Sequence, residues 1–133
     1  MKPNSHIKII IVDDHDLLRE GISARLSDVG YIEIIAEGCN GQEAVTLCKQ
    51  FKPDVLLMDI SMPVMNGLEA AKQIMETGLK TRIIFLSIYD DNEYIQEALR
   101  IGASGFVLKD VSKPEMLNAI RSVAEGATYL GPK

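Results

Sequence analysis

Two kinds of hydrophobic pattern alternate along the chain. Short runs in which nearly every position is apolar, rich in isoleucine, valine and leucine, predict buried β-strands. These runs cover residues 7–12, 55–58, 82–87 and 105–108, and an alternating stretch at 31–37 predicts a strand nearer the sheet edge. The longer segments between them carry apolar residues at steps of three and four, the spacing of one helical face. The sequence therefore predicts five strands and five helices in strict alternation.

Glycine or proline follows each helical segment, which is typical of helix C-termini. The stop signals are Gly30, Lys52-Pro53, Gly78, Gly102 and Gly126. The first helix is expected to reach Val29, the last residue of its apolar stripe. The second is expected to begin at Asn40, with Glu43 three residues later at the spacing of a capping box. The fourth is expected to begin near Asp91, and the fifth after Ser112 as its N-cap.

Alternating helices and near-continuous apolar strands indicate a parallel sheet covered by helices on both faces. Right-handed crossovers leave few topologies for five such units. We therefore expect a doubly wound α/β fold with the flavodoxin-like strand order 2-1-3-4-5. The domain is expected to span residues 7–126, preceded by a flexible N-terminus at 1–6 and followed by the beginning of an interdomain linker at 127–133.

Composition narrows the class of protein. The 133 residues are 47% hydrophobic and 25% charged, which is typical of one soluble domain. The net charge of −5 argues against a surface that itself binds nucleic acid or an anionic membrane. No apolar run approaches the length of a membrane span or of a signal peptide. Because Cys39 and Cys48 lack the spacing of a zinc site or a disulfide framework, we expect a reduced, cytoplasmic protein.

Candidate chemistry gathers where the predicted strands end. Ligands of doubly wound sheets bind outside the carboxyl ends of the strands, at the point where the strand order reverses. The first strand ends in Asp13-Asp14 and the third, its expected neighbour, ends in Asp59. The fourth ends in Ser87 and the fifth in Lys109. We therefore expect three carboxylates to share one pocket with a hydroxyl and an ammonium group.

Three carboxylates in one pocket need positive charge. Two like charges about 4 Å apart repel by roughly 4 kcal/mol at an effective dielectric near 20. Mg²⁺ binds a few carboxylates, keeps several waters and recruits phosphate oxygens, and a carboxylate can itself be the nucleophile of phosphoryl transfer. Each residue alone has a plainer interpretation: an aspartate that caps a helix, a solvated lysine, or a core phenylalanine at Phe106. Their conjunction at one rim favours a site for Mg²⁺ and phosphate.

Four segments, in this order, resemble the receiver domain family of response regulators. They are Ile11-Val12-Asp13-Asp14-His15, the run from Val55 to Gly67, Ile84-Phe85-Leu86-Ser87 and Gly105-Phe106-Val107-Leu108-Lys109. Each segment is weak alone, but together they are highly specific, and the resemblance covers residues 7–126. The details are most similar to the LuxR/NarL class of two-component transcription regulators.

The resemblance implies a role for each pocket residue. Asp59 would accept a phosphoryl group from a phosphohistidine on a sensor histidine kinase. Asp14, Asp59 and the Ser61 main-chain carbonyl would bind Mg²⁺ directly, and Asp13 would act mostly through a metal-bound water.

Further roles implied by the resemblance concern the response to phosphorylation. Lys109 would pair with the phosphoryl group, and the Ser87 hydroxyl would donate to one of its oxygens. Phe106 would be the aromatic side chain that swings inward when Ser87 shifts. The domain would assist its own phosphorylation and dephosphorylation without being an enzyme in the ordinary sense.

The resemblance also implies partners. Members of the class usually continue into a helix-turn-helix domain, so DNA would be bound only through an output domain absent from these residues. The alternative on sequence alone is a natural single-domain regulator. A homodimer on phosphorylation is expected, through the face formed by 91–101, 105–108 and 113–125 or through the first and last helices. The residues after Asp14, namely His15, Asp16, Leu17 and Arg19, suggest an exposed surface for kinase docking, and His15 is expected to cap the first helix or contact a partner.

Three rival interpretations remain open on sequence alone. A small Mg²⁺-dependent phosphatase with an aspartyl nucleophile would need a substrate-covering cap, and the chain has no insertion long enough. A flavin mononucleotide carrier would need a Ser/Thr/Gly-rich phosphate loop after the first strand, where this chain has acidic residues. A receiver-like interaction module would not need the complete pocket. The partner kinase, the signal, the target genes and the phosphoryl lifetime, which depends partly on Ser61 and Tyr89, are not determined by the sequence.

Overall fold

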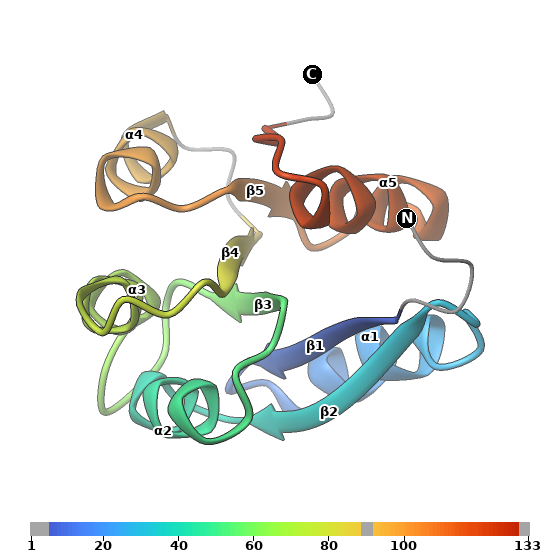
Figure 1. Cartoon of the computed structure of the whole chain (residues 1–133), viewed down its shortest axis with the longest axis horizontal. Coiled ribbons are helices and arrows are strands. Elements are labelled where there is room, and N and C mark those ends of the chain that lie inside the picture. Colours follow the sequence, from blue (N-terminus) through green and yellow to red (C-terminus); the bar gives the residue numbers. More distant parts are fainter. Residues whose placement is uncertain (1–5, 89–91, 131–133) are drawn as a thin grey trace.

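The computed structural model describes residues 6–88 and 92–130 of the chain. Five strands and five helices alternate within these residues, as the hydrophobic pattern predicts (Figure 1). The elements are β1 (Ile7–Val12), α1 (Asp16–Leu26), β2 (Ile32–Gly38), α2 (Gly41–Phe51), β3 (Val55–Asp59), α3 (Gly67–Glu76), β4 (Arg82–Ser87), α4 (Asn92–Ile101), β5 (Gly105–Leu108) and α5 (Lys113–Ala124).

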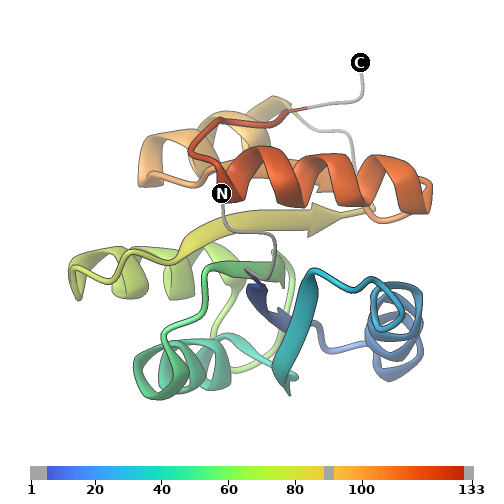
Figure 2. The ribbon, with the colours of Figure 1, turned by 45° about the vertical axis from the view of Figure 1, so that its right-hand side comes forward.

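The strands form one sheet in the order β2-β1-β3-β4-β5, and all four strand pairs are parallel. Helices α1 and α5 cover one face of the sheet, and α2, α3 and α4 cover the other (Figures 1 and 2). The predicted flavodoxin-like topology is therefore confirmed. The order reverses between β1 and β3, so the carboxyl ends of these two strands lie side by side at the switch point.

Each central strand is buried on both faces. Ile9 and Ile11 of β1 pack toward the α1 and α5 side, and Ile10 and Val12 pack toward the α2, α3 and α4 side. All four side chains are fully buried, which explains why the central strands are apolar at nearly every position. Each such side chain contributes about 1.5–3 kcal/mol of burial free energy, so the two cores hold the strand ends in fixed register.

The predicted end of the first helix needs correction. Helix α1 ends at Leu26 and does not reach Val29. The Val29 amide instead donates to the Leu26 carbonyl at 3.1 Å in a turn, from which its side chain still packs on the α1 and α5 core. Val29 thus continues the three- and four-residue spacing of the apolar stripe of α1, although it lies outside the helix. The start of α4 lies at Asn92, and the predicted start at Asp91 falls outside the described residues.

Capping explains where α2, α3 and α5 begin. The Asn40 and Ser112 side chains accept from the amides three residues on, as predicted. At α2, however, the Glu43 carboxylate accepts from the Cys39 amide at 2.8 Å, so the reciprocal bond of a capping box is displaced by one residue. The complete capping box lies at α3, between Asn66 and Glu69, where the sequence analysis predicted none.

The segment after α5 adds to the edge of the sheet. The Phe106 amide donates to the Tyr129 carbonyl, and the Tyr129 amide donates to the Ser104 carbonyl, both at 2.9 Å. Tyr129 thereby forms a parallel bridge with Gly105 of β5. Residues 1–5 and 131–133 of the predicted N-terminus and linker lie outside the described residues.

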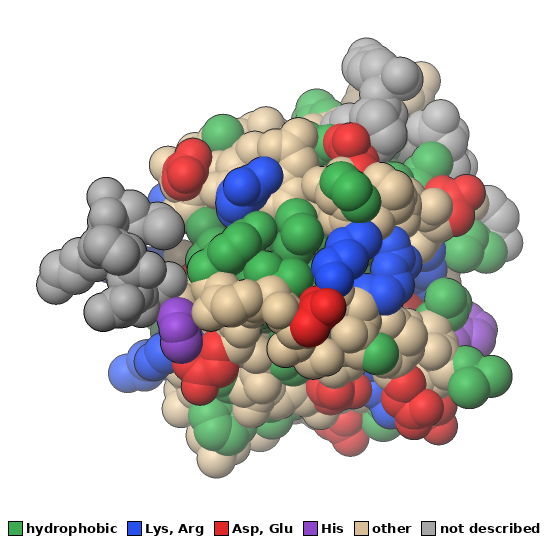
Figure 3. Space-filling view, turned by 90° about the vertical axis from the view of Figure 1, so that its right-hand side faces the viewer, with side chains coloured by type: hydrophobic (Ala, Val, Ile, Leu, Met, Phe, Trp, Pro, Cys, Tyr) green, Lys and Arg blue, Asp and Glu red, His purple; other side chains and the backbone are tan. Residues whose placement is uncertain are grey.

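One face of the molecule exposes apolar side chains beside basic ones. On the side that carries α1 and α5, hydrophobic side chains gather in the middle of the surface with lysine and arginine next to them (Figure 3). The Arg121 guanidinium lies 5.9 Å from the centre of the Tyr31 ring.

Among the described residues, none of the helices is both long enough and apolar enough to cross a membrane.

Candidate functional site

Strand register brings the predicted site residues to one rim. Val12 pairs with Met58, so Asp13 and Asp59 are the next residues on adjacent strands. Ser87 pairs with Leu108, and Lys109 follows it. Asp13, Asp59, Ser87 and Lys109 are all buried, although each is polar or charged. Buried charged groups are uncommon in protein interiors, so their presence together makes this rim of the sheet the candidate functional site.

The Lys109 ammonium is the cation of the pocket. Its Nζ lies 2.8 Å from Asp13 Oδ2 and 3.2 Å from Asp59 Oδ2. The side chains of Lys109, Asp13 and Asp59 are 5%, 0% and 7% exposed, so solvent screens these contacts little. One ammonium therefore faces two buried carboxylates, with Asp14 next to them. The pocket carries more negative charge than Lys109 neutralises.

Two carboxylate oxygens in the pocket lack a hydrogen-bond donor. Asp14 Oδ1 is buried and accepts no hydrogen bond, although the His15 ring Nδ1 lies 3.4 Å away, and Asp13 Oδ2 accepts none but lies 2.8 Å from the Lys109 ammonium. Ligand atoms of Asp13, Asp14, His15 and Asp59 all lie within 4.8 Å of one another. Buried, unsatisfied carboxylate oxygens so close together match the all-oxygen preference of Mg²⁺. The acidic cluster is thus typical of Mg²⁺ binding, and its residues fit the ion.

The charged form of Asp59 is disfavoured in this pocket. Burial raises the pKa of its carboxyl group, the charge of Asp13 raises it further, and Lys109 opposes both. Added positive charge near Asp59 would offset this cost.

His15 occupies the N-cap position of α1 but does not cap through its side chain. Its main-chain amide donates to Asp13 Oδ1 at 2.9 Å, and its ring Nδ1 lies 3.4 Å from both Asp13 Oδ1 and Asp14 Oδ1. The expectation that His15 caps the helix is therefore met by its position alone. The ring is 65% exposed at the mouth of the pocket.

Arg19 is the polar residue that the sequence analysis misplaced. It was expected on an exposed docking surface, but its side chain is only 15% exposed. Its Nη1 donates to the Asp13 main-chain carbonyl at 2.7 Å, its Nε donates to Glu37 at 3.1 Å, and its Nη2 lies 2.9 Å from Asp16. Burial lowers the pKa of Arg19, but the hydrogen bonds to Asp16 and Glu37 outweigh it and the net pKa is raised. A cation is unfavourable near the N-terminus of a helix, where the helix dipole is positive. The position of Arg19 in the first turn of α1 was therefore the feature of the sequence that indicated contacts with acidic groups.

Main-chain packing holds the loop behind Asp59. The Gly67 amide donates to the Ile60 carbonyl at 2.7 Å, and the Gly41 amide donates to the Met65 carbonyl at 2.9 Å. A Cβ at Gly67 would lie 2.2 Å from the Asp59 carbonyl oxygen, and one at Gly41 would lie 2.3 Å from the Met65 carbonyl oxygen. The first residues of α2 and α3 thus approach the loop more closely than any side chain would allow.

The remaining predicted residues differ in exposure. Phe106 is buried in the core on the α2, α3 and α4 side, and Ser87 is buried at the end of β4. Ser61 is exposed at the start of the loop after β3, and its role as a carbonyl ligand stays a prediction. Tyr89 lies outside the described residues.

Comparison with known proteins identifies the family. Residues 9–121 match the family model of the response regulator receiver domain. The chain is 40% identical over 127 residues to the transcriptional regulatory protein DegU of Brevibacillus brevis, covering 96% of this chain and 54% of that protein. It is 41% identical over 128 residues to the oxygen regulatory protein NreC of Staphylococcus carnosus, covering 96% and 59%. The chain belongs to the receiver domain family of two-component response regulators, and its relatives are of the NarL/LuxR class.

Solved structures agree in fold. The signal receiver domain of the response regulator NarL from Mycobacterium tuberculosis superposes with a TM-score of 0.88 at 35% identity, covering 92% of this chain and 98% of that one. A LuxR-family response regulator from Aurantimonas gives a TM-score of 0.91 at 29% identity, covering 96% and 91%. The resemblance predicted from the four motifs is thereby confirmed, against the rival flavin carrier and phosphatase interpretations. The chain spans 54% and 59% of the length of DegU and NreC, the curated relatives described above.

Proposed function

We propose that Asp59 accepts a phosphoryl group from a phosphohistidine of a sensor histidine kinase, in a reaction that depends on Mg²⁺. The observation that carries this proposal is the pocket itself: Asp59 Oδ2 lies 3.2 Å from the buried Lys109 ammonium, beside the unsatisfied Asp14 Oδ1. Such an arrangement places a carboxylate nucleophile next to groups that neutralise phosphate oxygens.

Each step follows from the groups present. An Asp59 carboxylate oxygen attacks phosphorus, the phosphorus–nitrogen bond breaks, and the electron pair of that bond leaves with the imidazole, which takes up a proton. Asp13, Asp14, Asp59 and Ser61 would hold Mg²⁺, which when bound neutralises charge on the transferred phosphoryl group. Lys109 pairs with the same group, and the Ser87 hydroxyl donates to one of its oxygens. Hydrolysis of the aspartyl phosphate in the same pocket ends the signal.

The phosphoryl group acts as a switch by adding about −1.5 to −2 units of charge. Ser87 and Lys109 stand at the ends of β4 and β5, so they are drawn toward it. This shifts the population of two states that differ in α4, β5 and α5 and in the position of Phe106. The domain is therefore a regulatory phosphoacceptor that assists its own phosphorylation and dephosphorylation.

Two partners follow from this role. An exposed apolar residue at the pocket mouth, Leu17 (85% exposed), favours kinase docking there, next to the exposed His15. The apolar and basic surface over α1 and α5 favours phosphorylation-dependent self-association, with the face of α4, β5 and α5 as the alternative (Figure 3). Sedimentation velocity with and without the phosphoryl group would distinguish a monomer from a dimer.

Regulation of transcription is proposed from the relatives. DegU is described as a transcriptional regulatory protein, and a Staphylococcus aureus relative in fold, with a TM-score of 0.84 at 30% identity, is described as a DNA-binding response regulator of the LuxR family. The net charge of −5 makes this domain unsuited to bind DNA directly. DNA binding would belong to an output domain beyond these residues, in the cytoplasm.

Phosphorylation is tested by intact mass after incubation with acetyl phosphate and Mg²⁺. The wild type is expected to gain one phosphoryl group, and Asp59→Asn or omission of Mg²⁺ is expected to prevent this. An equal adduct on Asp59→Asn would overturn the assignment of the phosphoacceptor. No adduct on the wild type under any condition would favour an interaction module instead.

A further inference from the structure

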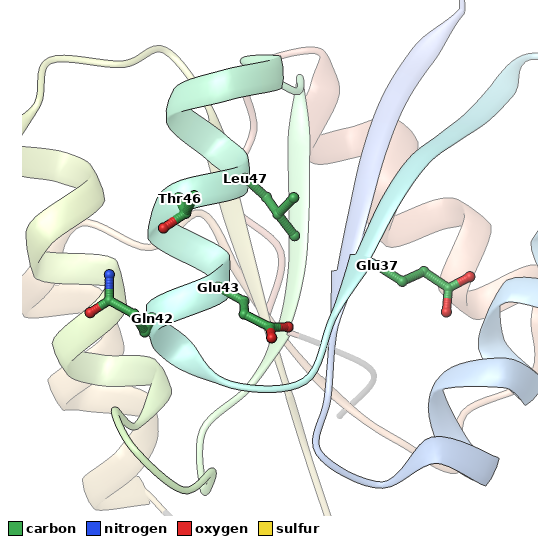
Figure 4. A pocket seen from close by; sticks show the side chains of 5 residues that line it. All are labelled: Glu37, Gln42, Glu43, Thr46 and Leu47. Atoms are coloured by element: carbon green, nitrogen blue, oxygen red, sulfur yellow. The ribbon is translucent and has the colours of Figure 1, made fainter.

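Arg19 connects two elements that meet at the acidic pocket. Its guanidinium donates to the Asp13 main-chain carbonyl at 2.7 Å and to the Glu37 carboxylate at 3.1 Å. Glu37 lies next to the last residue of β2 and, with Glu43 and other residues of α2, lines a shallow hollow; its carboxylate points toward α1 and away from α2 (Figure 4). The Asp13 carbonyl is thus tied through Arg19 to the edge strand.

The other bonds of Asp13 show why this tie matters. Its amide donates to the Gly38 carbonyl at 3.1 Å, and its Oδ1 accepts from the His15 amide at 2.9 Å. Because Lys109 also contacts Oδ2, the amide, the carbonyl and both carboxylate oxygens of Asp13 are each in contact with another residue. Arg19 supplies the contact to the carbonyl, and this carbonyl belongs to the peptide that joins Asp13 to Asp14. The orientation of that peptide influences the direction in which the Asp14 side chain leaves the main chain, and Asp14 Oδ1 has no hydrogen bond of its own to hold it.

Arginine suits this task for a chemical reason. A planar guanidinium donates in several fixed directions at once, whereas an ammonium is a single point of charge. The three groups that Arg19 contacts come from the β1–α1 loop, α1 and β2. A lysine at this position could bond one of them but not hold all three in a fixed relation.

We propose that Arg19 is a positioning residue for the divalent cation, acting through the Asp13-Asp14 peptide and held in place by Glu37. This inference rests on the proposed function, because it assumes that the acidic pocket binds Mg²⁺. Groups that orient metal ligands from behind typically contribute 10- to 100-fold to metal affinity. Loss of Arg19 should therefore weaken cation binding and leave the chemistry at Asp59 largely unchanged once the cation is bound.

The test measures cation binding apart from activity. The probe is Mn²⁺, whose free ion gives an electron paramagnetic resonance signal that disappears on binding. Arg19→Gln is expected to raise the dissociation constant about 10-fold or more, and Glu37→Gln, which keeps the bond to Asp13, is expected to raise it less. In phosphorylation by acetyl phosphate, Arg19→Gln should raise the half-saturating Mg²⁺ concentration and change the rate at saturating Mg²⁺ by less than about twofold.

Arg25→Gln is the matched control for a merely structural role. Arg25 lies on the same helix and donates from Nη2 to one main-chain carbonyl, that of Val111 in the loop between β5 and α5, at 2.8 Å. It should lower the free energy of unfolding as Arg19→Gln does, without changing the Mn²⁺ dissociation constant. Arg19→Lys separates charge from geometry: it keeps the charge but should recover only part of the lost affinity.

The outcomes distinguish this inference from the proposed function. If the wild type binds no Mn²⁺ and gains no phosphoryl group, the proposed function fails, and the positioning role fails with it. If the wild type does both and Arg19→Gln binds Mn²⁺ with wild-type affinity, only the positioning role is overturned. Full recovery by Arg19→Lys would show that charge alone matters and would also overturn it.

Discussion

Lys109 lies closer to Asp13 than to Asp59: its Nζ is 2.8 Å from Asp13 Oδ2 and 3.2 Å from Asp59 Oδ2. Without a phosphoryl group, the ammonium is therefore shared between a carboxylate proposed to bind the metal and the proposed phosphoacceptor. A new anionic group on Asp59 would compete with Asp13 for this lysine. If Asp59 is the phosphoacceptor, we therefore expect its phosphorylation to change the contacts of Asp13 and the position of Lys109, the residue that follows β5.

Lys109→Ala should destabilise the metal-free protein. The substitution leaves two buried carboxylates without their cation, and loss of one partner of a buried ion pair typically costs about 3–5 kcal/mol. Urea unfolding in the presence of a chelator measures the change, and Mg²⁺ should restore part of the stability. Lys113→Ala, which removes the exposed ion pair with Asp28, is the control and should change the stability little. Equal losses from the two substitutions would contradict the pairing.

Asp59→Asn should stabilise the metal-free protein at neutral pH. Because burial raises the folded-state pKa of Asp59, its protonated form favours folding; that contribution is complete below the unfolded pKa of 3.8 and is lost as the pH rises through the folded pKa. At pH 7 the wild type therefore bears the cost of the buried charge, whereas asparagine does not. Urea unfolding should show a stability difference that shrinks toward acid pH. A difference independent of pH would contradict the burial argument.

Gly67→Ala should disrupt the loop behind the phosphoacceptor. The new Cβ would lie 2.2 Å from the Asp59 carbonyl oxygen, so the main chain would have to move. We expect a loss of about 2 kcal/mol or more in the free energy of unfolding, together with slower phosphorylation. Gly21→Ala is the matched control, because Gly21 lies within α1 with no atom in the way of a Cβ. It should raise the stability, by up to about 1 kcal/mol.

The two cysteines should differ in reactivity. Cys48 is fully buried, and burial raises the pKa of its thiol to about 12, while Cys39 is exposed. The pKa of Cys39 is also raised, through its contact with Glu43, so its alkylation should be slow but should come first. Mass spectrometry after iodoacetamide at pH 8 should show one adduct on the folded protein and two after unfolding. Native Cys39→Ser should show none; rapid labelling of that variant would contradict the burial of Cys48.

Tyr129→Pro should expose the edge of β5. The substitution removes the Tyr129 amide, which donates to the Ser104 carbonyl. Without this bond, the Tyr129 carbonyl should also lose its hydrogen bond from the Phe106 amide. Hydrogen exchange of the Phe106 amide, followed by nuclear magnetic resonance, should become faster. Tyr129→Phe keeps both main-chain bonds and should exchange as the wild type does. Unchanged protection in Tyr129→Pro would mean that the bridge is not maintained in solution.

Most of the fold was predictable because burial on both faces leaves a strong signal. Continuous apolar strands such as Ile7–Val12 occur almost only in covered parallel sheets, and the bounds of this strand were predicted without error. The end of α1 was misjudged, because Val29 meets the core from a turn at helical spacing. Hydrophobic periodicity reports which residues are buried, not which hydrogen bonds they make.

The acidic pocket was predictable for a different reason. Asp13 and Lys109 directly follow β1 and β5, and Asp59 is the last residue of β3, so topology alone brings them together. The contacts of Arg19 were not predictable in this way, because a long side chain near a helix start can point outward or fold back. The close approach of Gly67 depends on how α3 enters the loop, which no local pattern records. The contacts that support the pocket were therefore found only in the structure, whereas the charged groups that gather in the pocket were predicted from the sequence.

Tyr129 fixes the segment after α5 to the edge of the sheet. Because its main chain is bonded to both neighbours of Gly105, Tyr129 lies beside β5 and does not simply extend the line of α5. The same strand carries Lys109 at its tip. A small shift of β5 along β4 would therefore move Tyr129 with it, without any helix having to rotate.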